Sequence, residues 1–75
     1  MNKKQLHILR HSLGIEYGKK EYRNHFVTGK GSKDYNSCMA LVSSGHMTRK
    51  KGDAATGGDD IFFVTDKGRA MAVGE

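Results

Sequence analysis

His7 and His11 are four residues apart in a segment with helical periodicity. This spacing places both imidazoles on one face of a helix, where a pair of histidines can hold a metal ion. No glutamate separates them in the His-Glu-x-x-His manner, and no third ligand is evident in the sequence. We therefore interpret the two histidines as part of a solvated helix face, and we expect neither a metal site nor a cofactor.

The nucleophilic side chains do not form a recognisable catalytic pattern. Cys38, the single cysteine, lies on the apolar side of a predicted helix, where a free thiol usually behaves as a small buried hydrophobe. Ser43 and Ser44 have no visible histidine and aspartate partners. We therefore expect no catalytic residues and a protein that is not an enzyme. A lone cysteine also excludes an internal disulfide, which is typical of a cytoplasmic protein.

Gly29, Lys30, Gly31 and Ser32 come directly before a predicted helix. Backbone N–H groups and the dipole at a helix start favour a phosphate there. The turn lacks the full spacing of a nucleotide-binding P-loop. It therefore indicates contact with one phosphate of a nucleic-acid backbone rather than with a bound nucleotide.

The chain has a formal net charge of +5, from 13 lysines and arginines against 8 aspartates and glutamates. Such an excess favours polyanions or acidic protein surfaces as partners. Basic residues dominate positions 1–33 and form a second cluster at Arg49, Lys50 and Lys51. No signal peptide is visible and no apolar run approaches the roughly 20 residues that span a bilayer, so we expect a cytoplasmic protein without a membrane partner.

The first predicted helix covers residues 3–13. Asn2 can cap its start, and Gly14 suits the left-handed residue that ends a helix, with Ile15 packing back on the last turn. Its apolar stripe consists of leucines at spacings of three and four: Leu6, Leu9 and Leu13. Ile8 lies off that stripe.

Residues 15–31 leave two structures open. Tyr22 and Phe26 are four apart, which permits one or two helical turns over residues 21–26. Residues 17–26 could equally be a short strand followed by a loop. Two glycines then force a turn before the next element.

Ser32 is the predicted N-cap of a central helix over residues 33–44, with Asp34 in the first turn and Gly45 as the stop. Its apolar side follows helical spacing: Tyr35, Cys38, Met39 and Val42. This helix is amphipathic, with a polar face opposite these residues.

Two strands and a last helix follow. The strands are predicted at residues 47–51 and 61–65, joined by a glycine-rich loop, and Thr65 and Asp66 can cap a short helix that runs through Met71. Alternation along the second strand sends its side chains to two sides. Phe62 and Val64 are on one side, and Ile61 and Phe63 are on the other.

Two phrases resemble the end of MarR-like and related winged-helix regulators: Leu41-Val42-x-x-Gly45-x-Met47-x-Arg49 and Phe62-x-Val64-Thr65-x-x-Gly68. In those regulators the recognition helix ends in Leu-x-x-x-Gly-hydrophobic, and the second wing strand ends in hydrophobic-Thr-x-x-Gly. The whole chain also resembles a group of small proteins from tailed phages and prophages, a likeness that implies no particular activity. The phrases that carry it are Tyr22-Arg-Asn-His-Phe-Val-Thr-Gly29, Cys38-Met-Ala-Leu-Val42 and Gly57-Gly-Asp-Asp-Ile-Phe-Phe-Val-Thr65.

The resemblance implies an α+β fold, a winged helix-turn-helix with a two-stranded wing hairpin, built as one domain over residues 1–75. It also implies that Phe62 and Val64 face the core, so that Ile61 and Phe63 need another cover. The chain departs from the family pattern in its weak positioning helix before the recognition helix. Its wing tip also carries aspartates, which would repel phosphates.

We therefore expect a small phage- or prophage-type protein that binds double-stranded DNA in the bacterial cytoplasm. The outer face of the central helix would enter the major groove, and the basic cluster would contact the flanking backbone. The predicted contact residues are Lys30, Ser32, Lys33, Asn36, Ser37, Arg49, Lys50 and Lys51. The alternative is a protein-interaction module on the same scaffold, which binds a host or phage protein or forms a homodimer through an apolar edge containing Ile61 and Phe63.

Overall fold

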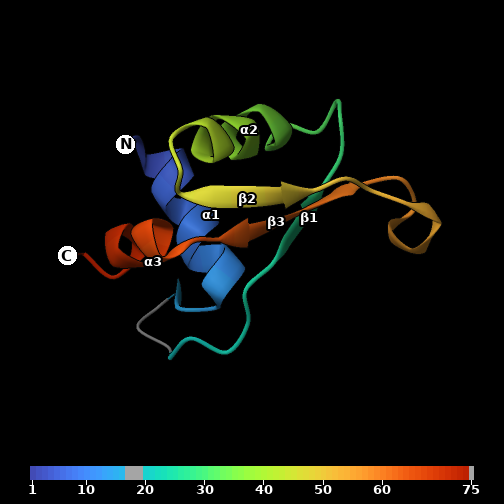
Figure 1. Cartoon of the computed structure of the whole chain (residues 1–75). Coiled ribbons are helices and arrows are strands. Elements are labelled where there is room, and N and C mark those ends of the chain that lie inside the picture. The colour runs from blue at the N-terminus through green and yellow to red at the C-terminus, as the bar shows by residue number, and fades with distance from the viewer. Residues whose placement is uncertain (17–19, 75) are drawn as a thin grey trace.

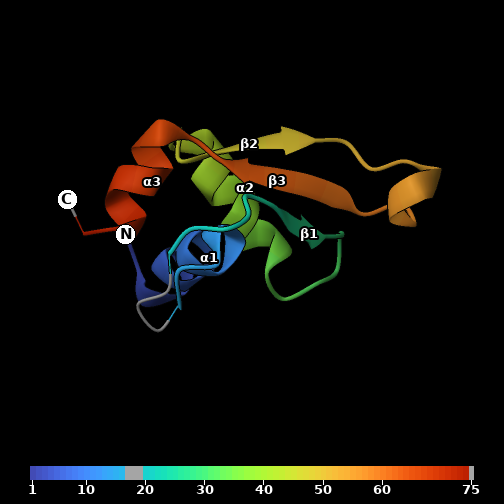
Figure 2. The ribbon, with the colours of Figure 1, turned by 90° about the horizontal axis from the view of Figure 1, so that it is seen from below.

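A computed structural model describes residues 1–16 and 20–74 of the chain. The regular elements of this part are α1 (Lys3–Leu13), β1 (Phe26–Thr28), α2 (Tyr35–Ser43), β2 (Met47–Lys50), β3 (Asp60–Val64) and α3 (Asp66–Ala72). The strands form one antiparallel sheet in the order β1-β3-β2, so β3 is central. The β2–β3 hairpin extends away from the helices, as Figures 1 and 2 show.

The start and end of α1 agree with the local sequence signals. The side chain of Asn2 accepts a hydrogen bond from the Gln5 N–H at 2.8 Å, and Gly14 adopts a φ of 74° after the last turn. The Ile15 N–H donates to the carbonyl oxygen of Arg10 at 3.1 Å, which closes a Schellman-type end. The predicted helix and both of its caps are therefore confirmed.

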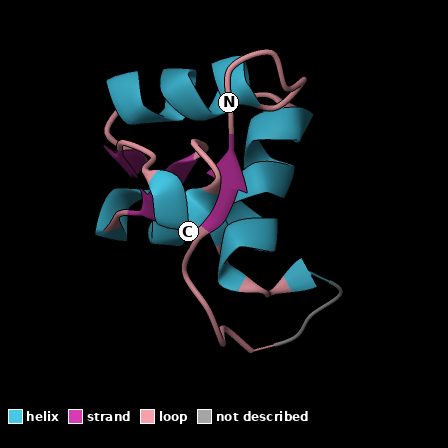
Figure 3. Ribbon diagram, turned by 90° about the vertical axis from the view of Figure 1, so that its right-hand side faces the viewer, coloured by secondary structure: helices cyan, strands magenta, loops and turns pink. Residues whose placement is uncertain are grey.

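The buried side of α1 is wider than the predicted leucine stripe. Leu9 and Leu13 are buried as predicted, but Leu6 is partly exposed and Ile8 is 1% exposed. Ile8 lies off the leucine stripe as predicted, but it is buried as well, so the stripe is only part of the buried side. The reason is that α1 contacts α2, α3 and the sheet together, so more than one side of the helix is covered. Figure 3 shows the helices packed on one another beside the strands.

The strand β1 lies between α1 and α2, in a segment for which helical turns were one of two predictions. Phe26 pairs opposite Phe62 of β3, and residues 20–25 have no regular secondary structure. The helical turns considered for residues 21–26 are therefore wrong, and the alternative of a short strand is closer. Residues 17–19, which belong to the same prediction, lie outside the described residues.

The central helix α2 lies within its predicted bounds but starts later. Asp34, and not Ser32, is the N-cap residue, and its side chain makes no cap hydrogen bond among the described residues. Ser32 Oγ instead accepts a hydrogen bond from the Asp34 N–H at 3.3 Å, and the Tyr35 N–H donates to the Ser32 carbonyl oxygen at 3.3 Å. The prediction of Ser32 as N-cap is wrong because residues 32–35 form a separate turn before the helix. Gly45, at a φ of 83°, follows the end of α2 as predicted.

The central strand supplies the inner face of the sheet. Phe62 is 0% exposed, Val64 is buried, and Met47 of β2 lies opposite Val64. The Tyr35 ring meets the Phe62 ring edge to face, with 5.9 Å between centroids. Further buried side chains of this core come from the three helices: Ile8, Leu9, Leu13, Cys38, Leu41 and Ala72. The prediction that Phe62 and Val64 face the core is confirmed.

The Thr-x-x-Gly phrase forms the corner between β3 and α3. Thr65 is the N-cap of α3, and its Oγ1 accepts a hydrogen bond from the Gly68 N–H at 3.2 Å. The same hydroxyl donates to the Gly45 carbonyl oxygen at 2.7 Å. A Cβ at Gly68 would collide with the carbonyl oxygen of His46. This phrase therefore fixes the start of α3 against the end of α2.

The described residues form a small α+β domain with three α-helices and a three-stranded antiparallel sheet. The expected hairpin is present as β2–β3, and β1 adds a third strand to it. A turn, and no α-helix, lies between β1 and α2 in the described residues, so the expected positioning helix directly before α2 is absent there. Each helix in this part of the chain is too short or too polar to cross a membrane.

Phe62→Ala should lower the free energy of unfolding by roughly 3–5 kcal/mol, because it removes a fully buried ring from the centre of the sheet. The matched control is Phe63→Ala, which removes the same side chain from the outer face one residue away. Urea unfolding followed by circular dichroism measures both. Equal losses in the two variants would show that the inner face of β3 is misassigned.

Candidate nucleic-acid interface

The outer side of α2 is polar and accessible. Asn36 and Ala40 are exposed on the side of the helix away from Cys38 and Leu41, and the half-buried Ser37, four residues before Leu41, lies at the edge of this face. Small and amide side chains on such a helix allow close approach to base edges in a DNA groove. The structure therefore brings two of the predicted contact residues, Asn36 and Ser37, to one accessible face.

Ser32 and Lys33 are exposed in the turn before α2. The Asp34 carboxylate lies 3.5 Å from Lys4 Nζ, and the same ammonium group donates to the Lys33 carbonyl oxygen at 2.5 Å. Lys4 therefore holds this turn against α1 and offsets the charge of Asp34. Because a carboxylate already stands at this helix start, it competes with a phosphate for the helix dipole. Lys33 is the accessible positive charge at this end of α2.

Arg49 takes part in a buried network around Asp60. Three donors from three parts of the chain bind this carboxylate: the Tyr35 hydroxyl at 2.9 Å, Arg49 Nε at 2.7 Å and the Gly52 N–H at 2.8 Å. The hydrogen bond from the Gly52 N–H, followed by the one from Arg49, lowers the pKa of Asp60 to about 2. The same carboxylate raises the pKa of Tyr35 and of Arg49 through its hydrogen bonds to them. The carboxylate is therefore ionised, and the Arg49 guanidinium is committed to it.

Lys30 and Lys51 come together at the base of the hairpin. A cavity of about 370 Å³ lies between the turn at residues 29–30 and the hairpin loop, and both lysines line it. Backbone of three loop glycines and the side chain of Asp59 line the same cavity. Three predicted contact residues from distant parts of the sequence, Lys30, Arg49 and Lys51, therefore line one recess.

The tip of the hairpin is an ordered turn. Asp53 caps the short 3₁₀-helix η2 (Ala54–Thr56), and its carboxylate accepts hydrogen bonds from the Ala55 and Thr56 N–H groups at 2.9 and 3.3 Å. The exposed carboxylate of Asp53 disfavours phosphates at the tip, and Asp59 lines the recess at the base together with the lysines. Any contact of the hairpin with a nucleic-acid backbone therefore belongs at its base.

The outer face of the sheet is apolar and uncovered in the described chain. Val27 and Phe63 are 46% and 36% exposed, and Ile61 between them is partly exposed. Lys50 lies opposite Ile61 in the β2–β3 register, on this same face. The predicted basic cluster is thus divided, because Arg49 and Lys51 line the cavity, where Arg49 also binds Asp60, whereas Lys50 faces outward from the sheet.

Cys38 and Ser44, two of the nucleophilic side chains, lie in different surroundings. Cys38 is fully buried, and burial raises the pKa of its thiol to about 11. Ser44 Oγ lies 2.6 Å from His46 Nδ1, a pairing that the sequence interpretation missed. The Nε2 atom of His46 is buried and has no hydrogen-bond partner among the described residues, so no third group orients the imidazole. Burial, and then the charge of Lys67, lowers the pKa of His46.

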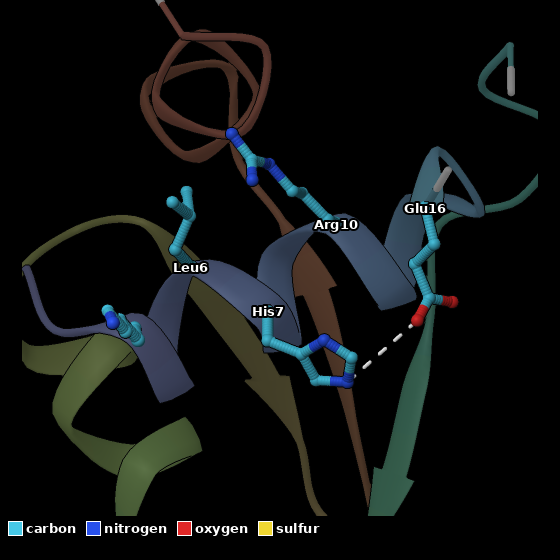
Figure 4. A pocket seen from close by; sticks show the side chains of 5 residues that line it. Leu6, His7, Arg10 and Glu16 are labelled. Atoms are coloured by element: carbon cyan, nitrogen blue, oxygen red, sulfur yellow. Dashed lines mark ion pairs between the residues drawn. The ribbon is translucent and has the colours of Figure 1, made fainter. Parts of the chain in front are cut away.

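A third metal-ligating side chain joins the two helical histidines. Glu16 Oε1 lies 2.6 Å from His11 Nδ1, and Glu16 Oε2 lies 3.8 Å from His7 Nε2 (Figure 4). The expectation that the pair has no third ligand is therefore wrong. The sequence signal for this third ligand is Gly14. Its left-handed conformation ends α1 and turns the chain back, so that Glu16 lies beside the helix.

Comparisons with protein-family models, characterised proteins and solved structures find no match for this chain. The chain is therefore classified by its fold and by the character of its surface. It is a small basic α+β domain with a polar-faced helix beside a β-hairpin.

The Asp60 network predicts a specific dependence of stability on pH. Because folding lowers the Asp60 pKa from 3.8 to about 2, its stabilisation is complete above about pH 4 and is lost as the pH falls toward 2. Asp60→Asn should lower the urea midpoint at pH 7 and flatten its fall between these two pH values. Asp59→Asn, at the neighbouring exposed carboxylate, is the control and should change neither. A parallel acid profile for parent and Asp60→Asn would contradict this role.

Proposed function

We propose that this chain is a small non-enzymatic protein of phage or prophage type that binds double-stranded DNA in a bacterial cytoplasm. It would do so on a winged-helix-like scaffold, with α2 as the recognition helix and β2–β3 as the wing. One observation carries the proposal: the polar outer face of α2 is accessible and exposed lysines flank its start. Lys33 directly precedes the helix, and Lys30 and Lys51 line the recess at the base of the hairpin.

In this proposal the lysines bind phosphates and position α2 in the major groove. Asn36 has the amide that can pair with adenine, and Ser37 can contact several bases. Arg49 supports the interface indirectly, because its bond to Asp60 holds the hairpin in place. Phosphate contacts then dominate the affinity, so binding is steeply salt-dependent and weakly sequence-specific.

The double variant Lys33→Ala, Lys51→Ala should weaken binding to every duplex sequence. The slope of log K against log salt should flatten by up to about 2 units, because two phosphate contacts are lost. Fluorescence anisotropy of a labelled random duplex from about 50 to 200 mM salt measures this slope. The matched control, Lys3→Ala with Lys20→Ala, removes the same charge outside the proposed interface.

Two results would count against DNA binding. Equal flattening in the control would mean that the effect is one of net charge alone. Absence of binding by the parent protein at low salt and micromolar concentration would remove the proposal.

A second function is favoured by the outer face of the sheet. Val27, Ile61 and Phe63 form an apolar surface on the side opposite the core, which is typical of a protein-binding face. In this alternative the chain is a protein-interaction module that binds a host or phage protein or forms a homodimer. This surface is separate from the outer face of α2, so the two functions can be tested independently.

The double variant Val27→Ser, Phe63→Ser tests this alternative. If the surface mediates self-association, the parent protein should dimerise with rising concentration in sedimentation equilibrium and the variant should remain monomeric. The DNA affinity and its salt slope should not change in the variant. A monomeric parent at high concentration rules out the homodimer form of this function.

A further inference from the structure

The His7, His11 and Glu16 side chains form a cluster on α1 that neither proposed surface includes. One ligand atom from each residue lies within 4.8 Å of the other two. We propose that this cluster is a binding site for a divalent transition-metal ion of the zinc class. The proposal is independent of the nucleic-acid function, because it rests on different residues and a different ligand.

The distances fit a small ion with little rearrangement. In a tetrahedral site with metal–ligand bonds of about 2.0–2.2 Å, neighbouring ligand atoms are roughly 3.3 Å apart. The distance from His11 Nδ1 to Glu16 Oε1 is 2.6 Å, a hydrogen bond that a bound ion would replace, and the distance from His7 Nε2 to Glu16 Oε2 is 3.8 Å. The two distances, which end on different carboxylate oxygens, bracket this value. The imidazoles are stacked with centroids 5.9 Å apart. Their side chains are 66% and 47% exposed, so both can rotate without moving the backbone.

The carboxylate is the fixed member of the cluster. The Glu16 side chain is 22% exposed, and Gly14 sets its approach through the left-handed turn after α1. Arg23 Nη2 lies 3.9 Å from Glu16 Oε1, and its guanidinium is anchored by hydrogen bonds of 3.0 and 2.6 Å to the His11 carbonyl oxygen. Arg23 therefore orients the carboxylate from outside the ligand set, as supporting residues of metal sites do.

The nearest basic residue on α1 turns away from the cluster. Arg10 donates through Nε to the Ala72 carbonyl oxygen at 2.9 Å. Figure 4 shows its guanidinium directed away from His7 and Glu16. This orientation keeps the positive charge of Arg10 away from the proposed metal position. The carboxylate of Glu16 offsets the positive charge of Arg23. With these charges nearby and a solvent-exposed site, we expect an affinity in the micromolar range.

The donor set defines the class of ion. Two imidazole nitrogens and one carboxylate oxygen suit zinc, copper, nickel and cobalt, whereas calcium and magnesium prefer oxygen ligands. Three protein ligands leave a further coordination position for water or another molecule. The imidazoles must be neutral to bind, so protons compete with the metal and the affinity should fall in acid. Bound metal would join α1 to the segment that follows it and so raise the melting temperature.

The test is titration of the tag-free full chain with zinc chloride, followed by calorimetry and by thermal unfolding. We expect one ion per chain, a rise in melting temperature, and little response to magnesium. His7→Gln, His11→Gln and Glu16→Gln should each weaken zinc binding at least about ten-fold. His25→Gln is the matched control, since this exposed histidine lies beside His11 but outside the cluster, and it should bind zinc as the parent does.

The variant Glu16→His distinguishes loss of a metal ligand from loss of folding. It replaces the carboxylate by a third imidazole, so zinc binding should be retained, and the cobalt complex should show the absorption change that a new nitrogen ligand produces. Circular dichroism checks that each variant is folded. Parent-like affinity in both Glu16→Gln and His7→Gln, or loss of binding in His25→Gln alone, would overturn the site. So would the absence of heat and of any thermal shift with excess zinc.

Discussion

The carboxylate of Asp60 joins the elements on which the rest of the structure depends. It stands at the start of β3 and binds the first residue of α2, an arginine of β2 and the backbone of the hairpin loop. A buried charge without partners is strongly unfavourable, so the three donors together offset the cost of burying this carboxylate. This one requirement sets the position of α2 against the sheet. It also offsets the charge of Arg49 through a bond to its Nε atom, so the proposed interface depends mainly on the lysines.

Features governed by neighbouring residues could be predicted from the sequence. Asn2 and Gly14 fix the ends of α1 through hydrogen bonds within a few residues, and Thr65 caps α3 in the same way. The aromatic and β-branched run around Phe62 has a strong strand preference, and its alternation identified the buried face. In each case the controlling interaction is local or repeats along one element, so the sequence pattern carries the information.

Features that depend on distant parts of the chain were missed. Ile8 is buried because three elements surround α1, and β1 exists through its pairing with β3. In the sequence Asp60 is one of several acidic residues near the loop. Its hydrogen-bond donors come close to it only when β2 pairs with β3. One part of the candidate site, the polar face of α2, could be predicted because it follows from helical periodicity. The position of Lys50, on the other face of the sheet from the recess lined by Arg49 and Lys51, follows from strand pairing. The approach of Glu16 follows from the path of the chain after Gly14.

The burial of Cys38 gives the chain a built-in reporter of its own motion. Thiol reagents attack the thiolate, and burial suppresses both access to the sulfur and ionisation of the group. Labelling of Cys38 must therefore wait until α2 separates from the sheet. Because the sequence holds one cysteine, the labelling rate of the unmodified protein measures how often that separation occurs. The same rate, taken with and without DNA, would show whether a ligand on the outer face of α2 holds the helix in place.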